Sequence, residues 1–198
     1  MTDIQNEVIA HLSTRRSAVA REMDGPGPDE AGIAEMLKIA ARVPDHGKIA
    51  PWRFIVVEGE ARAALAERLL KMAEEREGPI EGMRRDNELA RFTRPAVTVV
   101  VVSAPRPHPK VPRAEQVASA AAVCMNLIHA AHAYGFAAQW LTGWQAFDDG
   151  AARLLGVTAE ETVAGFISIG TRGNPLDERD RPDVPALTSR WKPDNEIG

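Results

Sequence analysis

The chain has 198 residues, and its 24 lysines and arginines against 28 aspartates and glutamates give a formal net charge of −4 at pH 7. That length predicts a single domain over 1–198. Hydrophobic residues make up 44% of the sequence and charged residues 26%, which excludes a disordered or collagen-like chain. The acidic balance, without a basic block, argues against a nucleic-acid-binding protein.

Three features predict a cytoplasmic protein. The single cysteine, Cys124, excludes an internal disulfide and suits a reducing compartment. Residues 1–7 carry two acids and lack the basic and then apolar layout of a signal peptide. The longest nearly uncharged stretch, 116–133, still contains Gln116 and Asn126, which lipid would not tolerate. We therefore expect a core helix there and no membrane span.

Helical periodicity and strand-like runs alternate along the chain. Asp29 is expected to cap a helix that ends near 42–43, because the residue before Pro44 is biased away from helical backbone. Residues 78–94 mix charged residues with single apolar ones, and we expect them to form an irregular, helix-containing excursion over the surface. The other predicted helices span 3–12, 61–77, 114–134 and 146–155, and the predicted strands span 52–58, 96–102, 136–141 and 163–170. Such alternation predicts an α/β or α+β sheet with helices on both sides.

The 114–134 helix is the most informative predicted element. It contains eight alanines, and Gly135 follows it as a stop signal. A helix of small side chains lets another element approach closely, so we expect it in the middle of the domain or on a subunit interface. The tail 173–198 is dotted with apolar residues that need a surface to cover. This pattern favours an arm packed on a partner subunit over a frayed terminus.

Common catalytic motifs are missing from the sequence. No G-x-G-x-x-G follows a strand, 47–48 lacks the rest of a phosphate-binding P-loop, and the serine of 165–170 is misplaced for a nucleophile elbow. His129 and His132 have no carboxylate or thiol at metal-ligand spacing, so packing is favoured over a metal site. Nothing adjacent to Cys124 would lower its pKa. We therefore predict no metal and no catalytic nucleophile.

The first of three polar clusters that packing explains poorly is Arg15-Arg16-Ser17. Its two guanidinium groups and its hydroxyl directly follow a predicted helix. Arginine pairs with phosphate oxygens through two parallel hydrogen bonds, which favours an anion site. A solvated helix C-terminus, where the helix dipole favours cations, is equally compatible with the pattern.

The other two clusters lie in loops next to predicted strands, where ligand-binding residues often occur. One is the polar loop 42–52, which two prolines pin and which contains Arg42, His46 and Lys48. The other is 140–144, where tryptophans flank a glycine that would let a flat ligand approach the backbone. A core tryptophan that caps the sheet is the alternative for this last cluster.

Short motifs that include these clusters follow one another along most of the chain. They are T-R-R-S-A at 14–18, R-x-P-D-H at 42–46, P-W-x-F at 51–54, K-V-P-R-x-E-Q at 110–116, W-x-T-G at 140–143 and G-F-x-x-x-G-T at 165–171. In order and spacing they resemble the FMN-dependent nitroreductase family, within its branch of small single-domain proteins. The resemblance implies an α+β fold with a mixed β-sheet flanked by helices, in a homodimer that exchanges its C-terminal arms, 173–198.

The resemblance also implies which residues bind a cofactor. Two FMN molecules would lie at the dimer interface, each between two subunits. The corresponding positions are Arg15, Arg16 and Ser17 for the phosphate, the ribityl chain and the pyrimidine edge, Arg42 and His46 for a second contact set from the other subunit, and Trp140, Leu141 and Thr142 beside the flavin.

The sequence departs from the family pattern at two of these places. Many relatives have N-x-Q-P-W where this chain has K-I-A-P-W at 48–52, so Lys48 is expected to contact the flavin in place of the usual Asn. Leu141 stands where relatives often carry a basic or hydroxyl residue. Only the backbone of Leu141 is therefore expected to contribute.

The activity implied by the resemblance is the reduction of nitro-aromatic, quinone or similar acceptors by NAD(P)H. The nicotinamide would deliver a hydride to flavin N5, leave, and be followed by the acceptor in a ping-pong cycle. Arg16, Arg42 or Lys48 would balance the charge of the reduced ring, without a catalytic acid or base. Other flavin reactions, a non-catalytic FMN-binding or regulatory dimer, and a helix-rich interaction protein without cofactor are the alternatives.

Overall fold

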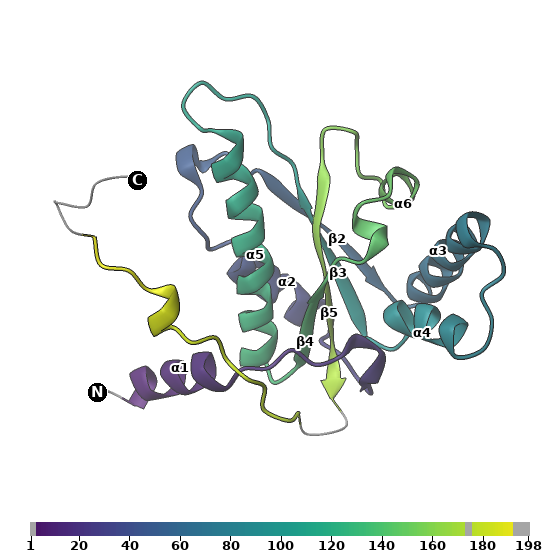
Figure 1. Ribbon diagram of the computed structural model, residues 1–198, viewed down its shortest axis with the longest axis horizontal. Helices are drawn as coiled ribbons and strands as arrows, with labels where there is room; N and C mark the ends of the chain where they lie inside the picture. Colours follow the sequence, from purple (N-terminus) through teal and green to yellow (C-terminus); the bar gives the residue numbers. More distant parts are fainter. Residues whose placement is uncertain (1–2, 173–175, 192–198) are drawn as a thin grey trace.

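The computed structural model describes residues 3–172 and 176–191, and it places a sheet between two layers of helices (Figure 1). The strands are β1 (Met23–Asp24), β2 (Trp52–Glu58), β3 (Val97–Ser103), β4 (Ala137–Leu141) and β5 (Thr162–Arg172). The helices are α1 (Asp3–Thr14), α2 (Glu30–Ala40), α3 (Ala61–Glu77), α4 (Gly82–Thr93), α5 (Arg113–Ala133) and α6 (Asp149–Leu154). Short 3₁₀ turns are η1 (Ala20–Glu22), η2 (His46–Lys48), η3 (Trp144–Ala146) and η4 (Pro185–Leu187). The predicted sheet with helices on both sides is confirmed.

The sheet has the strand order β1-β5-β3-β2, and β4 also pairs with β5. Every strand pair in the described residues is antiparallel, which differs from the mixed sheet we expected. The reason lies in the order of the strands. The α5 crossover leaves β3 and β4 parallel to each other, as a strand-helix-strand unit should. However, β5 lies between them and runs antiparallel to both.

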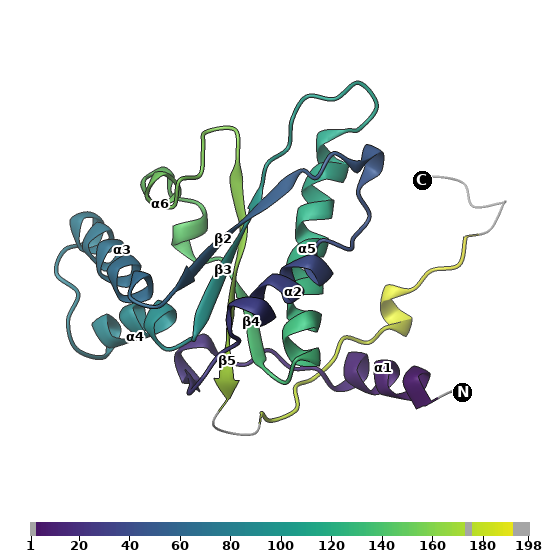
Figure 2. The same cartoon turned by 180° about the vertical axis from the view of Figure 1, so that it is seen from behind.

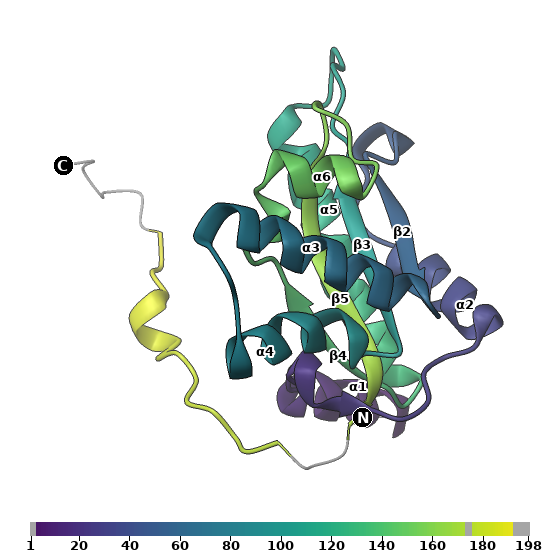
Figure 3. The same cartoon turned by 90° about the vertical axis from the view of Figure 1, so that its right-hand side faces the viewer.

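Alternate residues of β3 face two separate cores. Val97, Val99 and Val101 pack in the layer of α2 and α5, whereas Val100 and Val102 pack in the layer of α3, α4 and α6. Successive side chains of a strand point to opposite faces, so a continuous apolar run suits a strand that is covered on both sides. Figure 3 shows α3, α4 and α6 together in front of the sheet, and Figure 2 shows α2 crossing α5 on the other side.

Several predicted boundaries agree with the structure, others are shifted by one or two residues, and one predicted helix is divided. The strand over 52–58, the helix over 61–77 and the cap at Asp29, which accepts a hydrogen bond from the Gly32 amide at 2.8 Å, are confirmed. α1 continues two residues beyond the predicted end. The helix expected over 146–155 is divided into η3 and α6, because the Asp148 side chain accepts from the Ala151 amide at 2.9 Å and starts a new helix.

The excursion expected over 78–94 contains a regular helix, α4. Phe92 on this helix is 2% exposed, and its ring meets that of Phe166 on β5 edge to face, with the centroids 5.5 Å apart. Leu89 lies one turn earlier and is partly buried in the same core. α4 buries only a narrow apolar stripe, and most of the rest of the helix surface is charged. The hydrophobic pattern of this segment therefore looked irregular.

Two segments at the periphery leave apolar side chains exposed. The described part of the tail, 176–191, runs past α1 and away from the sheet (Figure 1), with Val184, Leu187 and Trp191 between 63% and 81% exposed. α1 exposes Ile4, Val8, Ile9 and Leu12. Surfaces of this kind commonly mark interaction sites. The remaining residues of the predicted arm lie outside the described residues.

Candidate functional site

The segment that follows α1 runs along the edge strand β4. The Ala18 amide donates to the Ala138 carbonyl at 3.2 Å, and the Ala20 amide donates to Gln139 Oε1 at 2.6 Å. These contacts bring the first predicted cluster, 15–17, to the same sheet edge as the third, which begins at the end of β4. Two clusters that are far apart in the sequence are therefore brought together.

Arg15 carries the clearest sign of a binding site. Its Nη1 atom is buried and finds no hydrogen-bond partner among the described residues. A buried charged donor without an acceptor costs about 1–3 kcal/mol or more. An anion beside Arg15 would remove this cost, so the local structure suits an anionic group.

A hollow of about 290 Å³ opens in the same region, between the end of α5 and the end of β5. Arg16, His132, Thr171 and Arg172 are among the residues that line it. Two guanidinium groups on one hollow suit a phosphate. In the described chain Arg16 donates to the carbonyl of Asp177 and lies 3.7 Å from a carboxylate of the tail. An anion that enters the hollow would compete with these tail contacts.

Sequence reasoning missed two residues of this hollow, His132 and Arg172. Arg172 directly follows the motif at 165–171, which was the available signal for a functional strand end. His132 was interpreted as a packing residue, because a histidine on a helix shows no functional pattern by itself. Only the fold brings both residues next to Arg16.

Three histidines gather at this end of α5. His11 Nε2 and His129 Nδ1 are 2.8 Å apart and link α1 to α5, and the His132 ring centroid lies 5.8 Å from that of His11. Burial lowers the pKa of His129 and of His132, and the positive charges of Arg15 and His11 lower both further. In the part of the chain that the structure describes, no group of three or more His, Cys, Asp or Glu could hold a metal ion.

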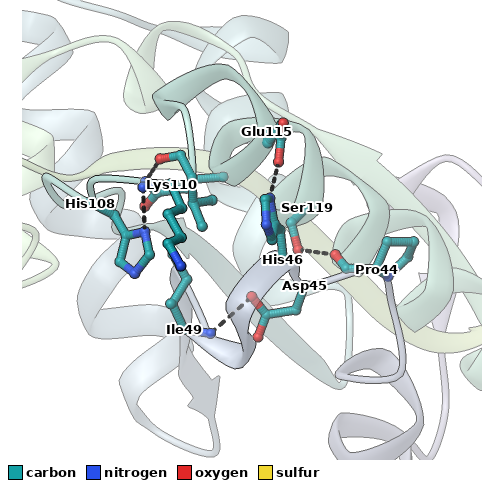
Figure 4. A network of polar contacts seen from close by, with 10 residues as sticks. Pro44, Asp45, His46, Ile49, His108, Lys110, Glu115 and Ser119 are labelled. Atoms are coloured by element: carbon teal, nitrogen blue, oxygen red, sulfur yellow. Dashed lines mark hydrogen bonds and ion pairs between the residues drawn. The ribbon is translucent and has the colours of Figure 1, made fainter.

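The second cluster is anchored to the opposite end of α5. His46 Nδ1 lies 2.7 Å from Glu115 Oε2, and the Ser119 hydroxyl donates to the Pro44 carbonyl at 2.7 Å (Figure 4). Ser119 also accepts from the indole N–H of Trp52 at 3.1 Å. The loop before β2 is therefore held firmly against the first turns of α5.

The same loop holds its cations outward on a constrained backbone. Asp45 accepts from the backbone amides of Ile49 and Ala50 at 3.1 and 2.8 Å. Inside this turn Lys48 has a φ of 53°, in the left-handed region that costs a non-glycine residue roughly 1–2 kcal/mol. The side chains of Lys48 and Arg42 are exposed. The loop thus presents positive charges at the surface from a constrained backbone.

Within a single chain, the His46 part of this loop lies apart from the arginines of the hollow. The loop begins beside the C-terminal half of α5, where the Asn126 side chain donates to the Arg42 carbonyl at 3.3 Å, and it reaches Glu115 at His46, whereas the hollow includes His132. Glu115 and His132 are 17 positions apart, which is roughly 25 Å at about 1.5 Å per residue. The His46 end of the second predicted cluster is therefore separate from the hollow within a single copy.

The third cluster, at the end of β4, offers mainly backbone. The Trp140 indole packs so closely over Gly165 that a side chain there would collide, and its N–H donates to the Ala164 carbonyl at 3.1 Å. This is the packing role that was the alternative for Trp140. Leu141 is partly buried in the core on the α3 side, and Thr142 is half-buried after the strand. Main-chain groups at 141–142 are therefore the part available to a flat ligand.

A family model described as the nitroreductase family matches residues 12–171 of this chain. The chain is 32% identical over 165 residues to a protein of Escherichia coli strain K12 named "Putative NAD(P)H nitroreductase YdjA", covering 81% of this chain and 85% of that protein. It is also 32% identical over 167 residues to a Haemophilus influenzae protein named "Putative NAD(P)H nitroreductase", covering 83% and 88%. The resemblance expected from the sequence motifs is confirmed.

Solved structures share the fold. A nitroreductase-like family protein from Bacillus cereus gives a TM-score of 0.79 at 20% identity over 97% of both chains. A mutant of NfnB, described as an FMN and NADPH-dependent nitroreductase from sphigopyxis sp. strain HMH, gives a TM-score of 0.74 at 18% identity over 93% of this chain and 98% of that one. The predicted α+β fold of nitroreductase type is confirmed. No helix within 3–172 or 176–191 has both the length and the apolar character needed to cross a membrane.

Proposed function

Because this chain belongs to the nitroreductase family and is therefore an oxidoreductase, we propose that it binds FMN and uses NAD(P)H to reduce nitro-aromatic, quinone or similar acceptors. The buried Nη1 of Arg15, which has no partner within 3–172 or 176–191, carries the proposal, since it suits the phosphate of a nucleotide. When bound, FMN would supply hydride-transfer chemistry at its N5 atom, which would link the nicotinamide to the acceptor in a ping-pong cycle. Two descriptions of similar proteins support the proposal. One relative is named "Putative NAD(P)H nitroreductase YdjA", which supports the reductant, and NfnB is described as FMN and NADPH-dependent, which supports both the cofactor and the reductant.

The hollow at the end of α5 fits only one end of such a nucleotide. Pockets that hold whole drug-sized ligands run from roughly 300 to 1,000 Å³, whereas this hollow measures about 290 Å³. We assign the phosphate to Arg15, Arg16 and Arg172. Ser17, exposed beside them, would hold the ribityl chain, and the backbone of 140–142 would lie beside the ring.

The rest of the site would come from a second copy of the chain. Two α5 helices that pack about a twofold axis perpendicular to them would run antiparallel, and the Glu115 end of one would then meet the His132 end of the other. Arg42, His46 and Lys48 of the partner subunit would then reach the nucleotide. Exposed small side chains on α5, such as Ala118, and the exposed apolar residues of α1 and of 176–191 support this dimer and an exchanged arm.

The chain's cations would assist the reaction by balancing negative charge on the reduced ring. Arg16 faces the hollow, which we assign to the phosphate, so Arg42 and Lys48 are the better candidates for this role. Asp45 fixes the loop backbone and thereby holds Lys48 in place before the reaction. A preorganised charge of this kind needs no rearrangement when the ring is reduced.

The test is an absorption spectrum of the full chain after incubation with FMN and desalting, followed by anaerobic addition of NADH or NADPH. We expect a yellow protein that at least one nucleotide bleaches and that a nitro-aromatic, quinone or enone acceptor reoxidises. A colourless protein overturns the proposal. A yellow protein that neither nucleotide bleaches supports the alternative, a non-catalytic FMN-binding dimer.

A further inference from the structure

Histidine 132 has a position that the proposed cofactor contacts do not explain. It lines the hollow together with Arg16 and Arg172, at the C-terminal end of α5. Its Nδ1 donates to the Ile128 carbonyl at 2.8 Å, and its ring also forms a hydrogen bond with the backbone of Arg16. His132 therefore ties the arginine segment to α5.

This bridge is complete only when the imidazole is protonated. A neutral imidazole has one N–H donor and one acceptor nitrogen, whereas an imidazolium has two donors. With Nδ1 committed to the Ile128 carbonyl, the second donor is Nε2–H of the charged form. A proton on Nε2 thus strengthens the hold on Arg16.

The surroundings of His132 oppose that proton in the chain alone. Cationic or titratable groups face it from each neighbouring element: His11 from α1, Arg15 and Arg16 from the segment after α1, His129 from α5 itself, and Arg172 from β5. The Glu178 carboxylate, which contacts Arg16, is 67% exposed. Burial and the charge of Arg15 accordingly hold the pKa of His132 below its ordinary value.

We propose that His132 is a positioning residue which takes up one proton from solvent when a phosphate monoester enters the hollow, and thereby clamps the Arg15-Arg16 segment around that phosphate. The dianion offsets the repulsion from the neighbouring cations, so the Nε2–H form becomes favourable. No bond to phosphorus is made or broken, and the transferred proton comes from the buffer. The inference rests on the proposed function, because it takes the monoester to be the phosphate of FMN.

The sign of the pH effect follows from linkage. The bound dianion raises the pKa of His132 from its lowered value in the free protein. Between the free and the bound pKa, binding takes up a proton, and affinity falls by up to about tenfold for each pH unit gained. Above the bound pKa this contribution is lost. The second ionisation of the phosphate, near pH 6, acts in the opposite direction and has to be separated by a control variant.

The experiment is an NMR titration of the histidine ring protons in the full chain, alone, with inorganic phosphate and with FMN. His132→Asn serves to assign the signal, because asparagine can still donate to the Ile128 carbonyl but cannot titrate. We expect the His132 pKa to rise by about one unit or more with each ligand. His108, which is exposed in the loop after β3, is the matched control and should stay unchanged.

A calorimetric titration supplies the second measurement. In buffers of different ionisation enthalpy near pH 6.5, FMN binding to the unmodified chain should take up more protons than binding to His132→Asn. Riboflavin, which lacks the phosphate, should show no such difference. The affinity loss in His132→Asn should be on the order of tenfold at pH 6 and should shrink by pH 8; an equal loss at both values would indicate a merely structural role and overturn the inference.

The two ligands separate the possible failures. If FMN binds but leaves the His132 pKa unchanged, the inference is wrong and the proposed function stands. If FMN does not bind but inorganic phosphate raises the pKa, the clamp serves another phosphate monoester and the proposed function is wrong. If neither ligand changes the pKa and FMN does not bind, both fall.

Discussion

The two ends of α5 hold histidines in opposite electrostatic settings. At the N-terminal end His46 faces the Glu115 carboxylate at 2.7 Å, with both side chains about half-exposed. At the C-terminal end burial and nearby cations lower the pKa of His129 and of His132, and the buried Arg15 Nη1 has no acceptor among the described residues. The first end pairs its histidine with a carboxylate, whereas the second holds cations that an anion would stabilise. This difference is why we place the proposed phosphate at the C-terminal end of α5.

The largest effect on FMN binding is expected when the α5 helices of two subunits are kept apart. Ala118 is exposed on α5, so Ala118→Arg should leave the single chain folded but should obstruct close packing of two helices. We expect sedimentation to show a monomer and desalting to remove all FMN. Ala64→Arg, on the exposed side of α3, is the control and should stay dimeric. A dimer with full flavin in Ala118→Arg would contradict the arrangement.

The next largest effect is expected from the unpaired charge itself. Arg15→Ala should weaken FMN binding by about 1.5–3 kcal/mol, the range for hydrogen bonds to charged groups, which is roughly 10- to 150-fold. Quenching of FMN fluorescence measures this directly. Arg68→Ala, exposed on α3, should change nothing. Unchanged affinity in Arg15→Ala would remove this residue from the site.

A smaller effect on FMN binding is expected at the N-terminal end of α5, where His46 is already paired with Glu115. His46→Gln should weaken FMN binding by less than about 1 kcal/mol, because Glu115 already pairs with the imidazole and the pair is exposed. Glu115→Gln, which frees His46 to face the ligand, should leave FMN affinity equal or higher in the same fluorescence titration. A greater loss in His46→Gln than in Arg15→Ala would reverse the comparison.

The smallest effect is expected at Cys124, which lies on α5 between its two ends. Cys124 is fully buried on α5, and burial raises the pKa of its thiol to about 12. At pH 8 only about one thiol in 10⁴ would be ionised. Mass spectrometry after iodoacetamide treatment should therefore show no alkylation of the native chain, and full alkylation once it is unfolded. Native alkylation of any variant above would mean that α5 itself is disturbed.

The sequence predicts local features of this fold better than pairings between distant segments. The strand over 52–58 was predicted correctly because its β-branched and aromatic residues act locally. The insertion of β5 between β3 and β4 depends on contacts between distant segments, and no local pattern encodes it. The division of the 146–155 segment follows from one side chain, Asp148, that caps α6.

The site shows the same contrast. Arg15 and Arg16 could be predicted because two adjacent arginines after a helix form a pattern within one segment. His132 and Arg172 could not, since each is ordinary in its own segment and gains meaning only where α5, β5 and the arginine segment meet. The resemblance to the family pointed to Arg42 and His46, and the fold adds that His46 lies at the N-terminal end of α5, whereas the Arg42 carbonyl accepts from Asn126 farther along the helix.

Dimers of two different variants test most directly whether each nucleotide lies between two chains. One chain carries Arg15→Ala, and the other carries Arg42→Ala with His46→Ala, so one site of the mixed dimer collects every change and the other collects none. We expect the purified mixed dimer to retain about one FMN, bound as tightly as in the unmodified protein. Two weakened sites and no tightly bound FMN would show that each chain builds its site alone.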